Sequence, residues 1–308
     1  MLKRERVPLF NRLRERLTFS KPKGPGYGIQ SGFYMSVLTG IAHLPTLKAF
    51  VNPKGENGAI PGFAVPLRGE DKSELEHPIL RGTYAVASLD RKTVLKMLVM
   101  STDESGFDPA PFLSSKAGQG LDPQVADRLR GAWHVIQFTF ESYDPDVGPA
   151  VSFLLDVTEK LAQLTDGVVA DPLSQVYRLP GVHADFPHPE LGYRVLDVLQ
   201  VKLNAGSGGL EIQTLGMQKF SLAELMFRDI TPVAAEAATQ YLLGLGMGVL
   251  KNGPMQPGSL VWESGFAFML TESGIQPGVN GGVLTYELLP QKGHDTSQVL
   301  LDWQKQLS

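Results

Sequence analysis

The stretch of the chain with the most potential metal ligands runs from residue 183 to residue 190. Imidazole and carboxylate groups both bind zinc, iron and manganese, and this stretch places two of each within eight residues. The spacing H-x-D-x-x-H-x-E therefore suggests a divalent transition metal and a metal-dependent hydrolase. Prolines within the stretch favour an extended backbone on which successive side chains diverge, so an exposed polar loop is the competing interpretation. The candidate metal ligands are His183, Asp185, His188 and Glu190.

A second group of carboxylates, Glu141, Asp144 and Asp146, directly follows a predicted strand. Such a group could bind a cation or take part in acid–base catalysis. Asp-Pro-Asp is also common in turns and at helix starts, where an aspartate accepts hydrogen bonds from the first free amides. We favour this second interpretation, with Asp146 as the N-cap of the helix that follows.

Three alternate glycines, Gly244, Gly246 and Gly248, have the composition of a nucleotide-binding loop. A phosphate-binding loop needs its glycines between a strand and the start of a helix, where the amides are free. These glycines instead fall near the end of a predicted helix, which favours close backbone packing. The chain also has no G-x-S-x-G nucleophile motif. The sequence thus offers no coherent catalytic set, and we expect no cofactor unless the 183–190 stretch holds a metal.

The composition limits the chemistry further. The chain has 308 residues, of which 43% are hydrophobic, and no cysteine. It is too apolar to be intrinsically disordered, and it is long enough for one large domain or two of ordinary size. The lack of cysteine excludes disulfides, cysteine-bound zinc, iron–sulfur clusters and thiolate nucleophiles. Histidine, aspartate and glutamate remain as metal ligands.

The charge is distributed unevenly along the chain. Residues 1–23 contain eight Lys and Arg residues and two Glu, a net charge of +6; because the whole chain has −4, the rest has −10. Residues 2–17 are expected to form an amphipathic basic helix, joined by a Lys/Pro/Gly linker to the acidic body. This helix could contact nucleic acid or an anionic membrane, or it could pack on the acidic body. Its candidate partner-binding residues are Arg6, Arg12, Arg14 and Arg16.

The first half of the chain has weak periodicity and many prolines. Residues 33–50 are expected to contain a short helix, whereas residues 63–65 and 83–88 have the composition of strands. Apolar residues at helical spacing predict a helix from Arg91 to Met100, capped by the preceding aspartate. Residues 101–122 are expected to form a loop.

The second half has clearer periodicity. A strand over residues 134–140, a helix over 147–164 and a strand over 167–172 form a predicted strand–helix–strand unit. A β-hairpin with its turn at Gly206–Gly209 follows a Pro/Gly-rich loop over residues 178–193. Further elements are expected at residues 195–203, 210–214, 222–227, 231–250, 266–270, 283–288 and 297–307.

Together these elements predict an α+β fold, a mostly antiparallel sheet with helices packed on one face, in one unit or in two similar-sized halves. Three parts are expected: a basic N-terminal helix and linker (1–24), an N-terminal α/β region (25–125) and a C-terminal α+β domain (126–308). We find no signal-peptide pattern and no run of about 20 apolar residues, which favours a cytoplasmic location.

Two stretches of the second half carry a family resemblance. In one, the helix over 147–164 is followed by Leu164–Pro172; in the other, Thr214–Met217 is followed by Phe220–Leu225 and a long helix. Through these stretches residues 130–262 resemble an uncharacterised bacterial family of domains of unknown function. The resemblance implies a stand-alone or accessory cytoplasmic protein, of a kind sometimes encoded near interbacterial immunity or stress loci, and it contributes no catalytic residue.

We therefore expect a non-catalytic cytoplasmic protein-binding protein, such as an adaptor, a scaffold or an immunity-like protein. An acidic body would favour a basic partner and would speed its approach by electrostatic steering. A metal-dependent hydrolase that uses the stretch from His183 to Glu190 is the alternative. A third hypothesis is a protein that contacts nucleic acid or an anionic membrane through residues 1–23.

Overall fold

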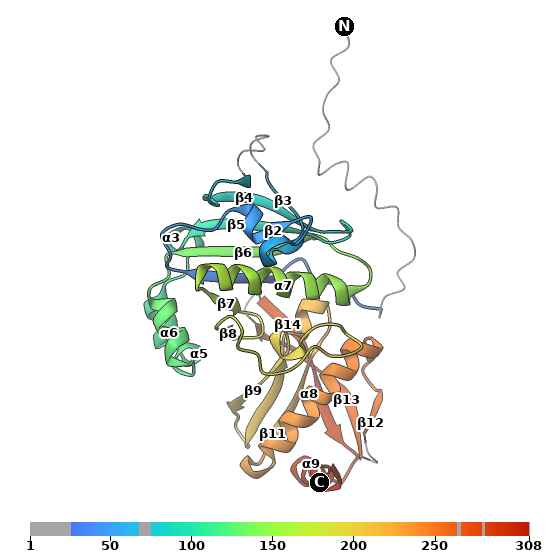
Figure 1. Cartoon of the computed structure of the whole chain (residues 1–308). Coiled ribbons are helices and arrows are strands. Elements are labelled where there is room, and N and C mark those ends of the chain that lie inside the picture. The colour runs from blue at the N-terminus through green and yellow to red at the C-terminus, as the bar shows by residue number, and fades with distance from the viewer. Residues whose placement is uncertain (1–25, 68–74, 264–265, 279–280, 308) are drawn as a thin grey trace.

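The computed structural model describes residues 26–67, 75–263, 266–278 and 281–307. In these residues the strands form two open, mostly antiparallel sheets, and helices pack against both (Figure 1). This arrangement confirms the predicted α+β class. The predicted basic helix, with the arginines at positions 6, 12, 14 and 16, lies outside the described residues.

The first sheet is built from β1 (Tyr34–Thr39), β2 (Val51–Asn52), β3 (Ile60–Pro66), β4 (Gly82–Ser88), β5 (Val94–Ser101), β6 (His134–Ser142), β7 (Val168–Asp171) and β8 (Val176–Arg178). Among the described residues its eight strands have the order β2-β3-β4-β5-β6-β1-β7-β8. Neighbouring strands are antiparallel except for β2 and β3. The 3-10 turn η1 (Glu56–Gly58) and the one-turn helix α2 (Leu47–Phe50) flank β2.

Helix α7 (Val147–Thr165) packs against the first sheet (Figure 1). Its buried residues recur every three or four positions, as expected for a helix with one apolar face. The helix connects β6 to β7, which lie on either side of β1, so the predicted strand–helix–strand unit is confirmed. It ends at Asp166, which has a left-handed φ of 49°. The next residue must be glycine, because a Cβ on Gly167 would lie 2.8 Å from the Val37 side chain.

The second sheet is built from β9 (Gln200–Ala205), β10 (Leu210–Leu215), β11 (Glu224–Ile230), β12 (Leu260–Glu263), β13 (Phe266–Gly278) and β14 (Gly281–Pro290). Among the described residues its order is β12-β13-β14-β11-β10-β9, with β11 and β14 parallel and the other pairs antiparallel. Its other elements are the 3-10 turns η3 (Val195–Asp197), η4 (Met217–Phe220) and η5 (Pro232–Ala234), and the helices α8 (Ala235–Asn252) and α9 (Thr296–Leu307).

Aromatic rings fill the core between the second sheet and its two helices. Tyr241 of α8 lies 5.0 Å from the Phe268 ring of β13 and 5.1 Å from the Trp303 ring of α9, measured between centroids. Both contacts have the edge-to-face geometry that aromatic pairs favour. These contacts fix α8 across the sheet, so that its C-terminal end points toward the first sheet (Figure 1).

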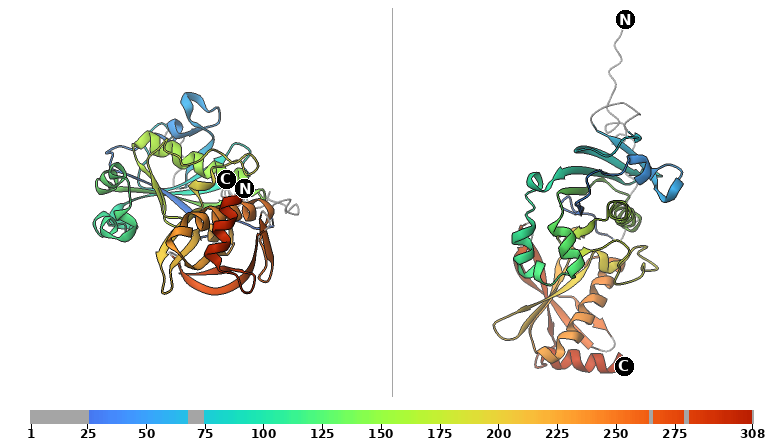
Figure 2. Two further views of the ribbon diagram at one scale, coloured as in Figure 1. Left: turned by 90° about the horizontal axis from the view of Figure 1, so that it is seen from below. Right: turned by 60° about the vertical axis from the view of Figure 1, so that its left-hand side comes forward.

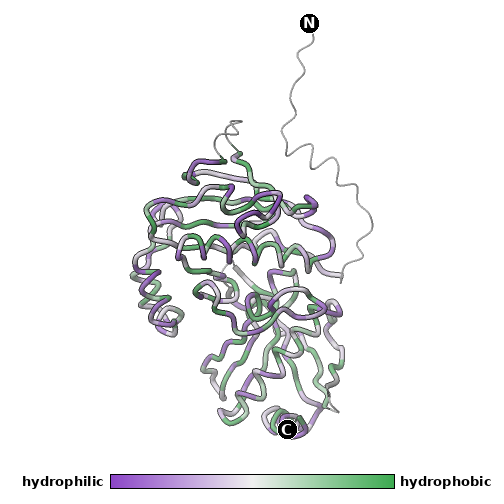
Figure 3. Tube along the Cα trace, viewed as in Figure 1, coloured by the Kyte–Doolittle hydropathy of each residue, from purple (hydrophilic) through white to green (hydrophobic). Residues whose placement is uncertain are grey.

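The two sheets lie one above the other along the length of the molecule, and a continuous core joins them (Figures 1 and 2). Phe33, just before β1, packs against Phe220 of η4 with ring centroids 5.8 Å apart. The amide of Gln30 donates to the Lys219 carbonyl at 2.8 Å. Hydrophobic residues are frequent along α7, α8 and the strands of both sheets (Figure 3). The position of α7 relative to α8 is therefore set by buried contacts.

The prediction of a helix over residues 91–100 is wrong, because Val94–Ser101 forms strand β5, which pairs with β4 on one side and β6 on the other. Arg91 has a left-handed φ of 61° in the turn between β4 and β5. Asp90 accepts hydrogen bonds from the Ser88 hydroxyl and the Lys92 amide in this turn, where it was expected to cap a helix. Strand β5 carries apolar side chains on its buried face (Leu95, Met97) and also on its half-buried face (Leu98), so its pattern also matches helical spacing.

Other expectations for the first half hold only in part. Residues 33–50 contain β1 and the single turn of α2, and residues 101–122 contain short helices where a loop was expected. The boundary predicted at residue 125 falls within the first sheet, since β6, β7 and β8 pair in a sheet whose other strands precede it. The helices between β5 and β6 are α3 (Thr102–Ser105), α4 (Pro109–Ser114), α5 (Lys116–Gln119) and α6 (Pro123–Arg130).

By length and composition alone, one described segment, Pro232–Asn252, could cross a membrane, although the sequence analysis found no such run. Half of this segment is buried inside the protein, where α8 packs on the second sheet. Core helices commonly pass the same test, so the segment is weak evidence for a membrane span.

Candidate functional site

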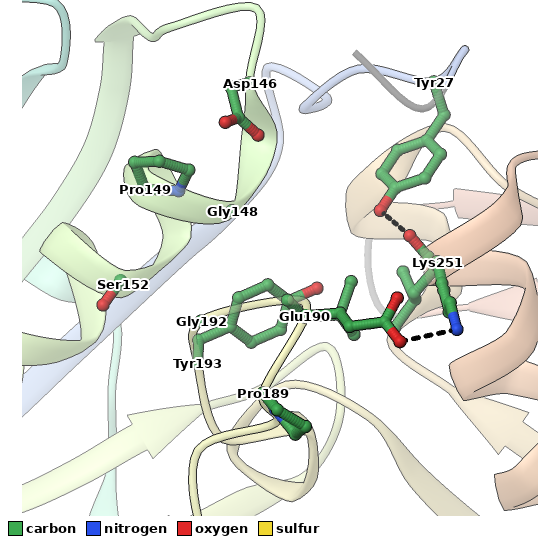
Figure 4. Close-up of a pocket in the computed structure, with 12 residues that line it drawn as sticks. Tyr27, Asp146, Gly148, Pro149, Ser152, Pro189, Glu190, Gly192, Tyr193 and Lys251 are labelled. Carbon is green, nitrogen blue, oxygen red and sulfur yellow. Dashed lines mark hydrogen bonds and ion pairs between the residues drawn. The ribbon is translucent and has the colours of Figure 1, made fainter.

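A cavity of about 600 Å³ lies where the start of α7, the loop after β8 and the end of α8 meet (Figure 4). Its volume is in the range of pockets that bind small molecules or side chains. We call it the junction cavity. Its lining residues are Tyr27, Asp146, Gly148, Pro149, Ser152, Pro189, Glu190, Leu191, Gly192, Tyr193, Leu250 and Lys251.

Asp146 forms the wall of the junction cavity at the start of α7. It occupies the predicted N-cap position, but its side chain accepts no capping hydrogen bond. Its own amide donates to the Asp144 carboxylate at 3.0 Å. The negative charge of Asp146 is stabilised by the positive end of the helix dipole. Its exposed carboxylate is therefore available to a ligand in the cavity.

The opposite wall is an exposed ion pair between the loop and α8. The Lys251 ammonium lies 2.7 Å from the Glu190 carboxylate, and the two side chains are 44% and 56% exposed. Pairs this exposed contribute little to stability, since water solvates both ions almost as well. A cationic ligand could thus displace Lys251 from Glu190 at small cost.

Two phenols complete the cavity. The Tyr27 hydroxyl donates to the Leu250 carbonyl at the end of α8. Tyr193 is only 2% exposed, and its buried hydroxyl makes no hydrogen bond of ordinary geometry within the described residues, although it interacts electrostatically with Tyr27. Burial raises the pKa of Tyr27 to about 12 and also raises the pKa of Tyr193. Both phenols are therefore neutral at pH 7 and can donate and accept hydrogen bonds.

In Figure 4 the Tyr193 ring stands between α7 and the Glu190 side chain. Its hydroxyl points away from α7, toward the side where Tyr27 and Lys251 lie. The loop approaches α7 closely here: a Cβ on Gly148 would lie 2.7 Å from the Leu191 carbonyl oxygen. The glycine at this position lets the loop that carries Tyr193 pack directly on α7.

A second hollow of about 510 Å³ adjoins the junction cavity and shares Pro149 and Ser152 with it. It lies between α7 and the turn from β4 to β5, and its charged residues are Asp90, Lys92, Asp144 and Asp156. We call the cavity and this hollow together the acidic trough. Five carboxylates and two ammonium groups line it, a net charge of −3.

The four predicted metal ligands lie in the loop between β8 and η3 but contact different partners. His183 Nδ1 lies 3.4 Å from Asp197, and the Asp185 carboxylate accepts from the Leu196 amide. His188 Nδ1 accepts from the amides of Glu190 and Leu191, each at 3.3 Å. Across the described residues no three His, Asp or Glu side chains are arranged to hold a metal ion. Of the four, Glu190 lines the junction cavity; metal binding stays a prediction.

A network around Arg178 anchors the start of this loop, and the sequence analysis did not find it. Arg178 makes two hydrogen bonds to Asp197, at 3.0 and 3.2 Å, and one of 2.6 Å to Glu159 on α7. Burial opposes ionisation of Glu159, but the Arg178 contact, together with hydrogen bonds from the Gly181 amide and Gln163, lowers the pKa of Glu159. The network holds the loop against α7, which places Glu190 and Tyr193 in the cavity.

A second buried cluster joins the two sheets. The Lys219 ammonium contacts the Asp171 carboxylate and lies 3.2 Å from the Ser174 hydroxyl, and all three side chains are at most 1% exposed. Burial lowers the pKa of Lys219. Lysine, serine and aspartate together could form a nucleophilic site, but a substrate has no access to groups this buried. The cluster therefore serves as a structural contact.

Comparison with known proteins gives no relative whose functional residues could be compared with this site. No family model, no curated protein and no solved structure matches the chain.

Proposed function

We propose that the chain is a non-catalytic, cytoplasmic protein-binding protein that holds a basic segment of its partner in the acidic trough. The trough is the observation that carries this proposal. It has a net charge of −3, is open to solvent along α7 and contains an unused carboxylate at Asp146. Its two hollows adjoin, so they suit an extended chain better than one small compact ligand.

Charge and burial both favour a partner with Lys or Arg. Asp146 has no hydrogen-bonded partner for its side chain among the described residues, and Glu190 has one that is easily exchanged. Charge complementarity of this kind raises association rates and selects partners of opposite sign. The resemblance of residues 130–262 to a bacterial family of accessory cytoplasmic proteins stays a prediction, since no family model matches the chain.

The alternative of a metal-dependent hydrolase has less support. His183, His188 and Asp185 each contact a different part of the protein. The one Lys–Ser–Asp cluster noted above is closed to substrate. No observation on the described residues favours catalysis over binding.

Fluorescence anisotropy with a labelled peptide tests the proposed function. The probe is a fluorescein-labelled eight-residue peptide that alternates Arg or Lys with Gly or Ser, and a Glu-containing peptide of equal length is its counterpart. We expect saturable binding of the basic peptide at 50 mM salt. The D146N/E190Q variant, which removes two charges from the trough, should bind about tenfold more weakly.

A matched variant separates the trough from general attraction to an acidic protein. Asp103 and Glu236 are exposed, lie in the first turns of other helices and do not line the trough. D103N/E236Q therefore removes the same charge elsewhere and should leave the affinity almost unchanged. Equal weakening in both double variants, or no binding of the basic peptide by the wild type, would show that the trough is not the site.

A further inference from the structure

We propose that the junction cavity is a subsite for one arginine side chain of the bound segment. This proposal rests on the proposed function and names the residue that the trough recognises. The cavity offers acceptors on two walls, the Asp146 carboxylate on α7 and the Glu190 carboxylate on the loop. A guanidinium carries five N–H donors in a plane, whereas an ammonium is a point charge.

The buried Tyr193 hydroxyl is the second observation that points to a ligand. It is enclosed, faces the cavity and lacks a hydrogen bond of ordinary geometry within the described residues. Its polar neighbour is the Tyr27 hydroxyl, whose own hydrogen is donated to the Leu250 carbonyl, so no donor from the described residues reaches the Tyr193 oxygen. A buried oxygen without a donor costs free energy, so such groups are uncommon in folded proteins. A guanidinium N–H placed in the cavity would supply the missing donor. The phenol is neutral at pH 7, since burial raises its pKa, and its oxygen is free to accept.

The surroundings of the cavity also suit a planar cation. The rings of Tyr27 and Tyr193 both line it, and guanidinium groups stack on aromatic faces more readily than ammonium groups do. The C-terminal end of α8, at Leu250 and Lys251, brings the negative end of a helix dipole to the same place. Each of these features favours a cation, and the rings favour arginine over lysine.

Lys251 is the internal competitor of the ligand. Its ammonium occupies Glu190 in the free protein at 2.7 Å, and an arriving arginine must displace it. Removing Lys251 should therefore strengthen binding. Lys48 provides a matched control, because it forms an equally short and also exposed pair with Glu76 that does not line the trough.

The test compares three peptides of one sequence, Ac-Gly-Ser-Lys-X-Lys-Ser-Gly-amide, in which X is arginine, lysine or citrulline. Citrulline has the shape of arginine without its charge. Binding to the full chain is measured by isothermal titration calorimetry. We expect the arginine peptide to bind about tenfold more tightly than the citrulline peptide and about threefold more tightly than the lysine peptide.

Variants of the cavity then assign the preference. Y193F should reduce the affinity for the arginine peptide about fivefold. K251A should strengthen binding of the arginine peptide about threefold, and K48A should have no such effect. The melting temperature of Y193F, equal to or above that of the wild type, shows that the variant is folded.

The proposal and the proposed function can fail separately. Equal affinity for the three peptides, with no effect of Y193F, would overturn the arginine subsite. If the same peptides still bound more weakly to D146N/E190Q than to D103N/E236Q, the proposed function would stand without the arginine subsite. A preference for arginine that survives in Y193F and in D146N/E190Q would place the recognition outside this cavity and would also overturn the subsite.

Discussion

Replacing Lys219 by methionine removes an ammonium group from the buried contact between the two sheets and leaves a side chain of similar length. Asp171 would keep its hydrogen bonds from the Ser174 hydroxyl at 2.6 Å and from the Leu173 amide at 3.0 Å. Its charge would nevertheless be buried without a cation. The Lys219 ammonium also lies 5.1 Å from the centre of the Phe33 ring, a contact that methionine cannot replace.

Breaking a buried ion pair by removing one partner costs about 3 to 5 kcal/mol. The hydrogen bonds that remain on Asp171 argue for the lower part of this range, about 3 kcal/mol. The free energy of unfolding of K219M is measured by urea denaturation at pH 7, followed by tryptophan fluorescence and circular dichroism. K48M, which removes an exposed pair of 2.7 Å, should change the free energy of unfolding much less than K219M does, because water solvates both ions of that pair.

The double variant D171N/K219M separates the pair from simple loss of packing. An amide in place of the carboxylate removes the unpaired charge, so the double variant should be more stable than K219M alone. A loss below about 1 kcal/mol for K219M, or a double variant as unstable as K219M, would refute the assignment of this contact as a buried ion pair that holds the sheets together.

Three further predictions concern stability and the loop. Glu224 accepts hydrogen bonds from Thr214 and two backbone amides, yet burial raises its pKa above 4.5. Because the pKa is raised in the folded state, the contribution of Glu224 to stability is fully present below pH 4.5 and is lost as pH rises through the folded-state pKa. Between pH 4 and 8 the free energy of unfolding, measured by urea denaturation, should therefore fall less for E224Q than for the wild type. An equal fall in both proteins would contradict this. R178M leaves Asp197 and Glu159 without their cation and should lose about 3 kcal/mol in urea denaturation, whereas a loss near zero would exclude an anchoring role. G148A places a Cβ 2.7 Å from the Leu191 carbonyl, so it should displace the loop and weaken binding of the basic peptide about threefold or more, and unchanged affinity would show that the loop does not shape the cavity.

The sequence predicted the elements with a clear period. The helix over 147–164, the hairpin with its turn at Gly206–Gly209 and the long helix after Thr231 are present in the structure. The error at residues 91–100 arose because β5 is apolar on both faces, although the face that carries Leu98 and Met100 is only half-buried. Its apolar residues, including Leu95 and Met97, then satisfy a helical as well as a strand pattern. Only the pairing with β4 and β6 distinguishes the two, and pairing is a long-range property.

The candidate site was much less predictable. Its walls come from residues 27, 146–152, 189–193 and 250–251, which are distant in the sequence and meet only through the packing of α7 and α8. Glu190 was singled out, but as a metal ligand, and Asp146 was singled out as a helix cap. Nothing in the local sequence distinguishes Tyr193 from an ordinary loop tyrosine. Its significance comes from a buried hydroxyl without a regular partner, which depends on three-dimensional surroundings.

Hydrogen–deuterium exchange of the full chain, with and without the basic eight-residue peptide, tests the central claim most directly. The acidic trough predicts slower exchange in the peptide complex at the start of α7, in the loop that carries Glu190 and Tyr193, and at the C-terminal end of α8. The second sheet near α9 should be unaffected. Protection confined to other surfaces, or equal protection of D146N/E190Q and the wild type at one sub-saturating peptide concentration, would contradict a binding site in the trough.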